Sequence, residues 1–101
     1  MRSQVVELGE GFEINGEFFK TVTLREPRVA DMLTAEQEAP ENGKSLAFRA
    51  ALIAACIEKV EGYDGMVTFK MIAGLSLTDF DLLLSTQSNL DEKGAKETKK
   101  D

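Results

Sequence analysis

The chain has no histidine, one cysteine and no tryptophan among its 101 residues. Without histidine there is no Ser–His or Cys–His catalytic pair, and zinc lacks its usual ligands. The one cysteine, Cys56, cannot form an internal disulfide, and its apolar neighbours fit a buried thiol in a reducing compartment. The sequence therefore predicts a protein that is not an enzyme and holds no metal or cofactor.

Positive charge is also scarce, with 12 Lys+Arg against 18 Asp+Glu and a net charge of −6. Nucleic acids and anionic membrane surfaces attract proteins through a positive field, so neither is expected as a partner. The longest apolar stretch, residues 50–57, covers eight residues. A membrane-spanning helix needs roughly 20. With no apolar leader at the amino terminus, we expect the protein to stay where it is made.

The amino-terminal quarter carries two runs of β-branched and aromatic residues around Asn15-Gly16, which predicts a β-hairpin. A two-residue turn would split the apolar side chains between both faces of the hairpin. A turn longer by one residue, with Ile14 opposite Phe18, gathers them on one face and is favoured. Gly9 and Gly11 in the first run predict a bulge or bend.

Helical patterns follow Pro27. The first, residues 29–39, is amphipathic, with Val29, Met32 and Leu33 on one face. A loop is predicted at Pro40-Glu41-Asn42-Gly43. The second helix, residues 46–60, is capped by Ser45; it is apolar around most of its circumference, so we expect it to be central and most buried.

Two further helices are predicted after residue 65. One spans about residues 68–73 and ends at Gly74, which suits a left-handed cap. The other begins after Ser76 and runs over residues 77–90, with its apolar stripe on one side. The sequence thus predicts an α+β fold: an N-terminal β-hairpin followed by about four helices packed around one central apolar helix.

The predicted globular domain spans residues 1–90. Residues 91–101 contain four acids, four lysines and no large apolar side chain, so we expect a flexible, disordered, charged C-terminal tail. The chain as a whole is 43% hydrophobic and 30% charged, which is typical of a globular protein rather than a disordered one.

No group of polar residues forms a recognisable catalytic or metal-binding motif. Asp79 and Asp81 lack the further ligands and central glycine of a calcium loop, and helix capping and solvation explain both. Cys56 has no base to activate it. The remaining feature is apolar surface: Leu82 lies off the stripe of the last helix, and either Phe18 or Phe19 faces away from the main apolar side.

These side chains have two interpretations. A neighbouring helix covers them, or they form part of a partner-binding patch. The second interpretation names Phe19 and Leu82 as partner-binding residues.

The residues Thr23-Leu24-Arg25-Glu26-Pro27, followed by residues 29–36, resemble the "TLREP…GDLLAAE" segment of the tail assembly chaperones of Mu-like contractile-tailed phages. The resemblance continues through residues 51–54, Leu75-Ser76-Leu77 and Asp79-Phe80, and covers residues 12–90. Arg28 stands where such proteins often carry Thr or Ser. The first helix is therefore expected to lose a cap.

The resemblance implies a chaperone in the host bacterial cytoplasm that binds the tape measure protein and keeps it soluble during tail tube assembly. It also implies a longer form, made by a ribosomal frameshift near Lys99 and Lys100, that helps recruit the tail tube protein. Homo-oligomerisation stays open. The alternative is a small structural subunit of a phage tail, such as a tube or connector protein, and a carboxylate-dependent enzyme is a third option. Size-exclusion mass distinguishes the first two.

Overall fold

A computed structural model describes residues 2–38 and 45–99, with the backbone alone for residues 92–99. It contains a three-stranded antiparallel sheet in the order β1-β2-β3, and four helices. The elements are β1 (Ser3–Ile14), β2 (Glu17–Arg25), α1 (Val29–Glu38), α2 (Leu46–Cys56), β3 (Ile57–Val60), α3 (Phe69–Ala73) and α4 (Leu77–Lys99).

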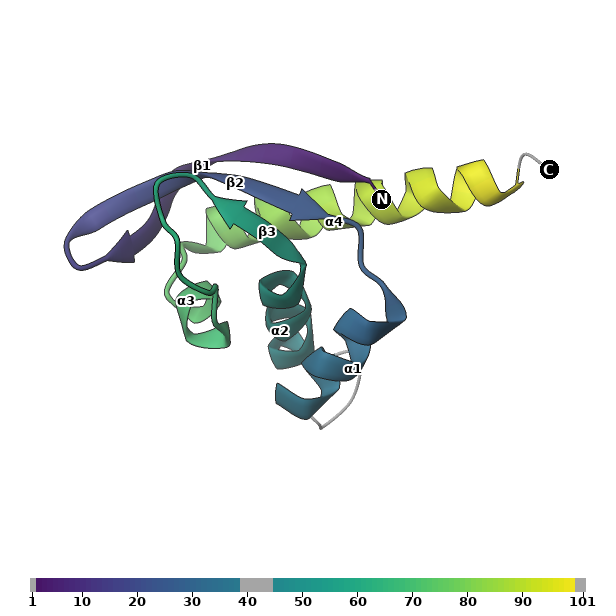
Figure 1. Cartoon of the computed structure of the whole chain (residues 1–101), viewed down its shortest axis with the longest axis horizontal. Coiled ribbons are helices and arrows are strands. Elements are labelled where there is room, and N and C mark those ends of the chain that lie inside the picture. The colour runs from purple at the N-terminus through teal and green to yellow at the C-terminus, as the bar shows by residue number, and fades with distance from the viewer. Residues whose placement is uncertain (1, 39–44, 100–101) are drawn as a thin grey trace.

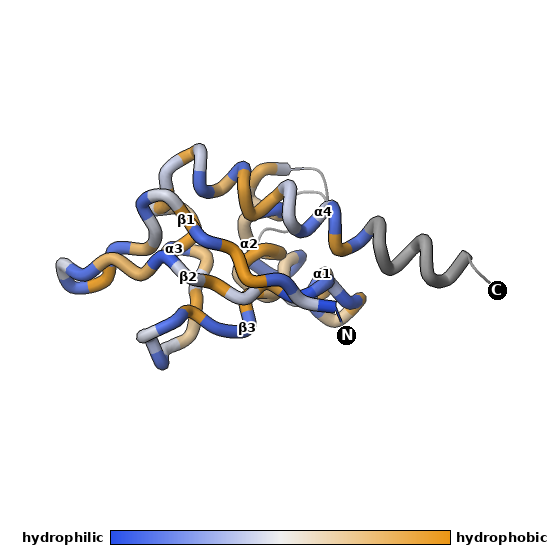
Figure 2. Tube along the Cα trace, turned by 90° about the horizontal axis from the view of Figure 1, so that it is seen from above, coloured by the Kyte–Doolittle hydropathy of each residue, from blue (hydrophilic) through white to orange (hydrophobic). Residues whose placement is uncertain are grey.

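The helices lie in two places relative to the sheet. In Figure 1, α1, α2 and α3 lie below the strands, whereas α4 runs behind them. Seen from above, α4 lies alongside β1 and β2 (Figure 2). Its carboxyl end extends beyond the sheet (Figure 1). The mixture of an N-terminal sheet with four helices confirms the predicted combination of elements, although the third strand was not predicted.

The hairpin turns on two residues, Asn15 and Gly16, with Ile14 opposite Glu17. The longer turn, with Ile14 opposite Phe18, is therefore wrong. Asn15 has a φ of 53° and Gly16 a φ of 84°. Two successive positive φ angles define the turn type that best matches the twist of a hairpin, and Asn-Gly is its preferred sequence.

A bulge in β1 keeps the apolar side chains together despite the short turn. Between the pairs Glu7–Thr21 and Phe12–Phe19, β1 has four residues where β2 has one, so the alternation of faces is inverted across the bulge. The predicted irregularity at Gly9 and Gly11 is thus confirmed. Residues from both sides of the bulge are buried in one core: Val6, Leu8, Phe12, Val22 and Leu24.

Asp79 of α4 holds this bulge. The backbone N–H groups of Gly9, Glu10 and Gly11 donate to its carboxylate at 2.7, 3.0 and 2.9 Å. The predicted cap at Ser76 is confirmed, since its hydroxyl oxygen accepts from the Asp79 N–H at 3.2 Å. Solvation does not explain Asp79, however, because the residue is only 1% exposed. Its carboxylate joins the first strand to the last helix.

Gly11 is the position in the bulge where no residue with a side chain would fit. Its φ is +86°, and a Cβ there would collide with the carbonyl oxygen of Phe19. Both constraints favour glycine, which has no Cβ and adopts positive φ readily.

The second helix ends earlier than predicted. α2 stops at Cys56, and Ile57–Val60 form β3, which pairs with β2, so the predicted helix end at Val60 is wrong. Ser45 caps α2 as predicted, accepting from the Phe48 N–H at 3.0 Å. α2 contacts α1, α3, α4 and β2. The central role of α2 in stability stays a prediction.

The ends of the last two helices also differ from the predictions. Gly74 follows α3 with φ −85° and ψ −5°, a right-handed conformation, so the predicted left-handed cap is wrong. α4 continues to Lys99, beyond the predicted end at Leu90. Glu, Lys and Ala in residues 91–99 are good helix formers, which explains how a charged segment can be helical. The division into a domain of residues 1–90 and a flexible tail stays a prediction.

Two predictions lie outside the described residues. They are the loop at Pro40-Glu41-Asn42-Gly43 and the last two residues of the tail. Within the described ranges, no helix is long and apolar enough to cross a membrane.

The substitution Ile53→Asp tests the role of α2. Ile53 is fully buried in the core, and an unpaired buried carboxylate costs several kcal/mol against a total stability of about 5–15 kcal/mol. We expect the variant to be unfolded in thermal melts monitored by circular dichroism. Arg49→Asp, at an exposed position of the same helix, should stay folded. A folded and only slightly weakened Ile53→Asp variant would show that α2 is not central.

The substitution Asp79→Ala tests the bulge. It leaves three N–H groups without their acceptor, and hydrogen bonds to a charged group contribute about 1.5–3 kcal/mol each, so we expect a loss of about 3 kcal/mol or more at pH 7. Urea unfolding measures this loss, and the exposed Asp81→Ala variant serves as control. An Asp79→Ala stability equal to that of Asp81→Ala would contradict the assignment.

Lowering the pH should reduce the difference in the free energy of unfolding between Asp79→Ala and wild type. Burial by itself would raise the pKa of Asp79, but the N–H groups of the bulge and the Ser76 hydroxyl outweigh burial and hold this pKa below its ordinary value. A carboxyl whose pKa is lower in the folded state stabilises the fold above its unfolded pKa of about 3.9. That contribution is lost as pH falls through the folded pKa. Urea unfolding between pH 7 and pH 3 should show the two proteins converging.

Candidate partner-binding surface

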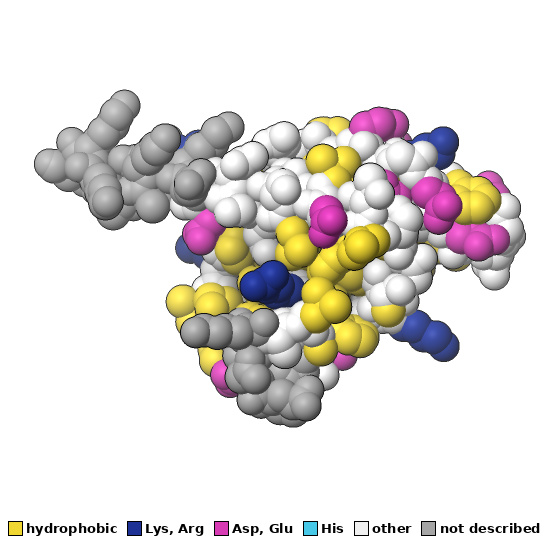
Figure 3. Space-filling model, turned by 180° about the vertical axis from the view of Figure 1, so that it is seen from behind, with side chains coloured by type: hydrophobic (Ala, Val, Ile, Leu, Met, Phe, Trp, Pro, Cys, Tyr) yellow, Lys and Arg dark blue, Asp and Glu magenta, His cyan; other side chains and the backbone are white. Residues whose placement is uncertain are grey.

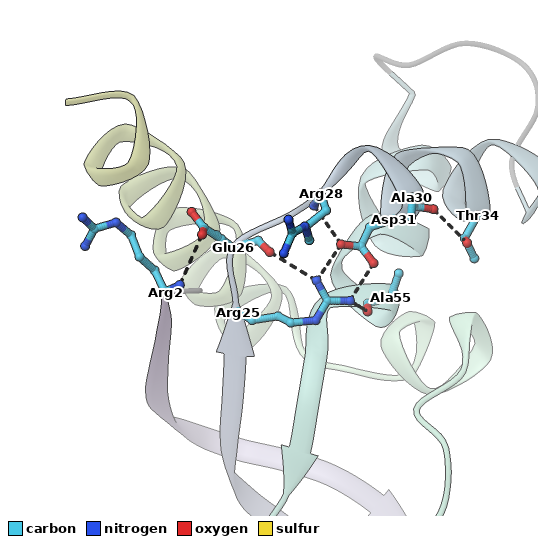
Figure 4. Close-up of polar contacts among 8 residues, drawn as sticks. All are labelled: Arg2, Arg25, Glu26, Arg28, Ala30, Asp31, Thr34 and Ala55. Carbon is cyan, nitrogen blue, oxygen red and sulfur yellow. Dashed lines mark hydrogen bonds and ion pairs between the residues drawn. The ribbon is translucent and has the colours of Figure 1, made fainter. Parts of the chain in front are cut away.

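An ion pair between Arg25 and Asp31 fastens α1 to the sheet. The two guanidinium nitrogens donate to the two carboxylate oxygens at 2.6 Å each, and Arg25 also donates to the carbonyl oxygen of Ala55 at 2.9 Å (Figure 4). The bond to Arg25 outweighs burial and lowers the pKa of Asp31. Arg25 therefore connects the end of β2, the start of α1 and the end of α2 in one network.

Asp31 also closes the start of α1. Its carboxylate accepts from the backbone N–H of Arg28 at 2.8 Å, while the Arg28 carbonyl accepts from the N–H groups of Asp31 and Met32 at 3.0 and 3.2 Å. A carboxylate that reaches back from the third helical residue is half of a capping box. The helix start is thus supported by a carboxylate within the helix, although the Arg28 side chain is not of a capping type.

The orientation of α1 leaves its apolar side in solvent. Asp31 and Ala35 are buried, whereas Val29, Met32 and Leu33 are 72, 47 and 57% exposed. The predicted amphipathic helix is present, but the face that pattern reasoning would place on the core points outward. We call Val29, Met32 and Leu33 the α1 face. Three large apolar side chains at helical spacing, held on a fastened helix, are typical of a protein-binding surface.

The exposed charges of α1 oppose its helix dipole. Arg28 lies at the start, where the dipole is positive, and Glu36 lies near the negative end. The last turn has no basic residue. Each such charge costs roughly 0.3–1 kcal/mol at an exposed helix end. These charges do not stabilise the isolated helix, which suits a role in contacts with another molecule.

A groove of about 850 Å³ adjoins α1, between α2, β3 and residues 63–70. Thr34 and Glu38 of α1 form part of its wall, and Ala51, Ala54 and Ala55 of α2 line it with small side chains. On the opposite face of the molecule from Figure 1, hydrophobic side chains gather beneath α4 (Figure 3). The lining of the groove also includes Glu58, Lys59, Asp64 and Lys70, so the groove is mixed in character, whereas the surface beneath α4 is apolar.

The two residues named from the sequence lie on different elements. Leu82 on α4 is 40% exposed, beside the buried Phe80 and Leu83 of the helix stripe. Phe19 on β2 is half-buried, packs against the core and lies 5.8 Å from the ring of Tyr63. Its neighbour Phe18 is 52% exposed. The structure thus makes Leu82 accessible and gives Phe19 a packing role in addition to any contact with a partner.

The α1 face was missed as a site by the sequence reasoning. Asp31 could have indicated the α1 face from the sequence. This acidic residue follows Arg25 by six residues and lies on the same helix as the three apolar side chains. Pairing these two residues turns the opposite side of the helix outward.

Among the described residues, Cys56 is a buried free thiol. Burial raises the pKa of the Cys56 thiol to about 12, so this cysteine stays protonated and is a poor nucleophile. Within residues 2–38 and 45–99, no three carboxylates or thiols come together as a metal site would require.

Comparison with known families agrees with an assembly role. Residues 5–89 match the model of a family of phage tail assembly chaperones. The family is described as "Phage tail assembly chaperone proteins, E, or 41 or 14", and the chain belongs to it. Its members are chaperones rather than enzymes. The searches of the curated proteins and of the solved structures returned no match.

Proposed function

We propose that this chaperone binds the tape measure protein of a Mu-like contractile-tailed phage and keeps it soluble until tube subunits polymerise around it. Binding takes place in the cytoplasm of the host bacterium and involves no catalysis. The observation that carries the proposal is the outward α1 face, with Val29, Met32 and Leu33 exposed on a helix fastened by Arg25. Apolar residues at this spacing bind the apolar side of another helix.

The charge of the chain supports the same role. A holdase must expose apolar surface and still remain soluble, and a net charge of −6 opposes non-specific aggregation. A structural tube or connector subunit would share the lack of chemistry, but the family match favours the chaperone.

A longer frameshifted form that recruits tail tube protein is part of the proposal. The gene tests it directly: a slippery heptamer at the codons for Lys99 and Lys100, followed by an open overlapping frame, supports the longer form. A gene without the heptamer would exclude the longer form.

Replacing Met32 and Leu33 together by Ser should weaken binding without unfolding the chaperone. Both side chains are about half exposed, so the melting temperature should stay near that of wild type. Co-expression with the tape measure protein of the same phage, followed by co-purification, measures binding. We expect at least a tenfold lower yield of soluble tape measure protein.

The matched control is Val5→Ser, an exposed apolar residue on β1 away from α1. It should bind as wild type does. If wild-type chaperone does not increase the soluble fraction of the tape measure protein, the proposed function is wrong. Full binding by the Met32→Ser, Leu33→Ser variant would contradict the role of the α1 face but not the proposed function.

Leu82 and Phe19 are proposed as additional contacts. Leu82→Ser should leave the melting temperature near wild type and weaken co-purification, because the side chain is exposed at the edge of α4. Phe19→Ser tests folding as well as binding, since Phe19 packs on Tyr63, so Leu82→Ser is the cleaner variant. Unchanged binding would exclude this role for Leu82. A melting temperature lowered as much as by truncation of a core residue would exclude it as well.

A further inference from the structure

The outer edge of β1 has no strand beside it. β1 is the first strand of the sheet and pairs with β2 on its other side. In Figure 1 the free edge points upward, where no other described element lies. An open edge presents unpaired backbone groups and pairs readily with the strand of another chain. β1 is thus the place where a further strand can join the sheet.

The hydrogen-bond pattern decides which residues of β1 turn their backbone groups to this edge. The Glu26 N–H donates to the Arg2 carbonyl at 2.8 Å, so the even-numbered residues of the regular stretch bond to β2. The odd-numbered residues, Ser3, Val5 and Glu7, turn their N–H and C=O groups outward. All three are exposed, and the described part of the chain offers these backbone groups no partner.

The opposite edge of the sheet is protected, whereas the β1 edge is not. β3 has four residues, an irregular register with β2 and a lysine, Lys59. The Tyr63 N–H also occupies the carbonyl of Val60 at 3.0 Å. Short length, irregular pairing and lysine are usual means of blocking an edge. Residues 3–7 of β1 are regularly paired and contain no lysine, proline or glycine, so this edge is open to pairing.

We propose that β1 pairs antiparallel with β1 of a second copy of this chain, across a two-fold axis at Val5. The usable edge ends at Glu7, because the Gly9 N–H already donates to Asp79 and the bulge follows. Val5 is the centre of the stretch that remains. Pairing Val5 with its copy places Ser3 opposite Glu7 on both sides of the axis, and each facing pair exchanges two backbone hydrogen bonds.

The side chains along this edge suit a second copy. Val5 is 61% exposed, and in the pair its own copy covers it. The Glu7 carboxylate already accepts from the hydroxyl of Thr21, which lies opposite on β2, at 2.8 Å. In the pair, the Ser3 hydroxyl of the second copy makes the same kind of contact from the other side. A register that sets Glu7 against Glu7 would oppose like charges, which disfavours it.

The pairing is expected to be weak. Five residues of edge bury less than the about 1,200–2,000 Å² of a stable interface, so the dimer should dissociate on dilution. It joins two three-stranded sheets into one sheet of six strands. In Figure 1, α1 lies on the other side of the strands from this edge, so the α1 face stays exposed in both copies. The pairing is therefore independent of the proposed function.

The substitution Val5→Lys tests the pairing without disturbing the fold. The side chain is exposed, so the melting temperature should stay near that of wild type. Two lysines would meet at the axis, and like charges directly opposite each other destabilise a strand pair. We expect sedimentation equilibrium to show a dimer at least about fivefold weaker than wild type. The control Phe18→Lys adds the same charge at an exposed apolar residue of the hairpin and should dimerise as wild type does.

Disulfide formation tests the register. Cysteines bridge when their Cα atoms lie about 4.4–6.8 Å apart, as directly opposite residues do, whereas residues four positions apart along a strand are separated by about 13 Å. Under mild oxidation, an equal mixture of Ser3→Cys and Glu7→Cys proteins should form disulfide-linked dimers. Each variant alone should form them far more slowly. Wild type is the control, because its Cys56 is buried.

Amide hydrogen exchange of the wild-type protein shows what occupies the edge. The N–H groups of Ser3, Val5 and Glu7 should exchange fast in dilute protein and become protected as the concentration rises, while those of Gln4 and Val6 are protected throughout. Wild-type protein that stays monomeric up to millimolar concentration overturns the pairing, and so does a Val5→Lys variant that dimerises as wild type. Protection of the outward amides only on addition of tape measure protein would assign the edge to that protein and overturn the pairing as well.

Discussion

The pair of charges at Arg25 and Asp31 determines which side of α1 faces the domain. Asp31 is one of only two residues of the helix that are buried, and its carboxylate is held by both guanidinium nitrogens of Arg25. Losing one partner would leave the other charge poorly solvated, which costs more than the pair contributes in net terms. A polar contact thus takes the inward position that apolar side chains usually occupy, and Val29, Met32 and Leu33 are left outside.

This constraint gives the resemblance to the chaperone family a physical meaning. Residues 23–27, which contain Arg25, and residues 29–36, which contain Asp31, carry the resemblance to the family. In the structure they are bonded to each other. Likewise, Asp79 lies in another segment that carries the resemblance. Its carboxylate binds the glycine bulge of β1. The residues that carry the resemblance therefore fix how α1 and the hairpin are placed.

Local patterns were enough to predict the hairpin, the bulge and the starts of α2 and α4. The Asn15-Gly16 turn, the cap at Ser45 and the cap at Ser76 each depend on a few adjacent residues. The hairpin register was predicted wrongly because the bulge adds three residues to β1, and pairing across it depends on Asp79, 68 residues after Gly11. β3 was missed because Ile57–Val60 continue an apolar helix pattern and become a strand only by pairing with β2.

The candidate site likewise has one part that adjacent residues indicate and one part that depends on a contact between elements. Leu82 was identified from its position on the helix wheel, and the structure leaves it exposed. The α1 face could not be placed from periodicity alone, because an apolar stripe indicates which residues share a side and not whether that side meets the core. Only the contact between Arg25 and Asp31 decides this, and it joins two elements.

Oxidation of the methionines by dilute hydrogen peroxide, followed site by site with mass spectrometry, tests the outward orientation of α1 most directly. Met66 is 83% exposed and Met71 is half-buried, so the protein contains its own fast and slow standards for Met32, which is 47% exposed. Met32 should react at a rate close to that of Met66. A Met32 as slow as Met71 would place the apolar side of α1 against the domain and contradict the account.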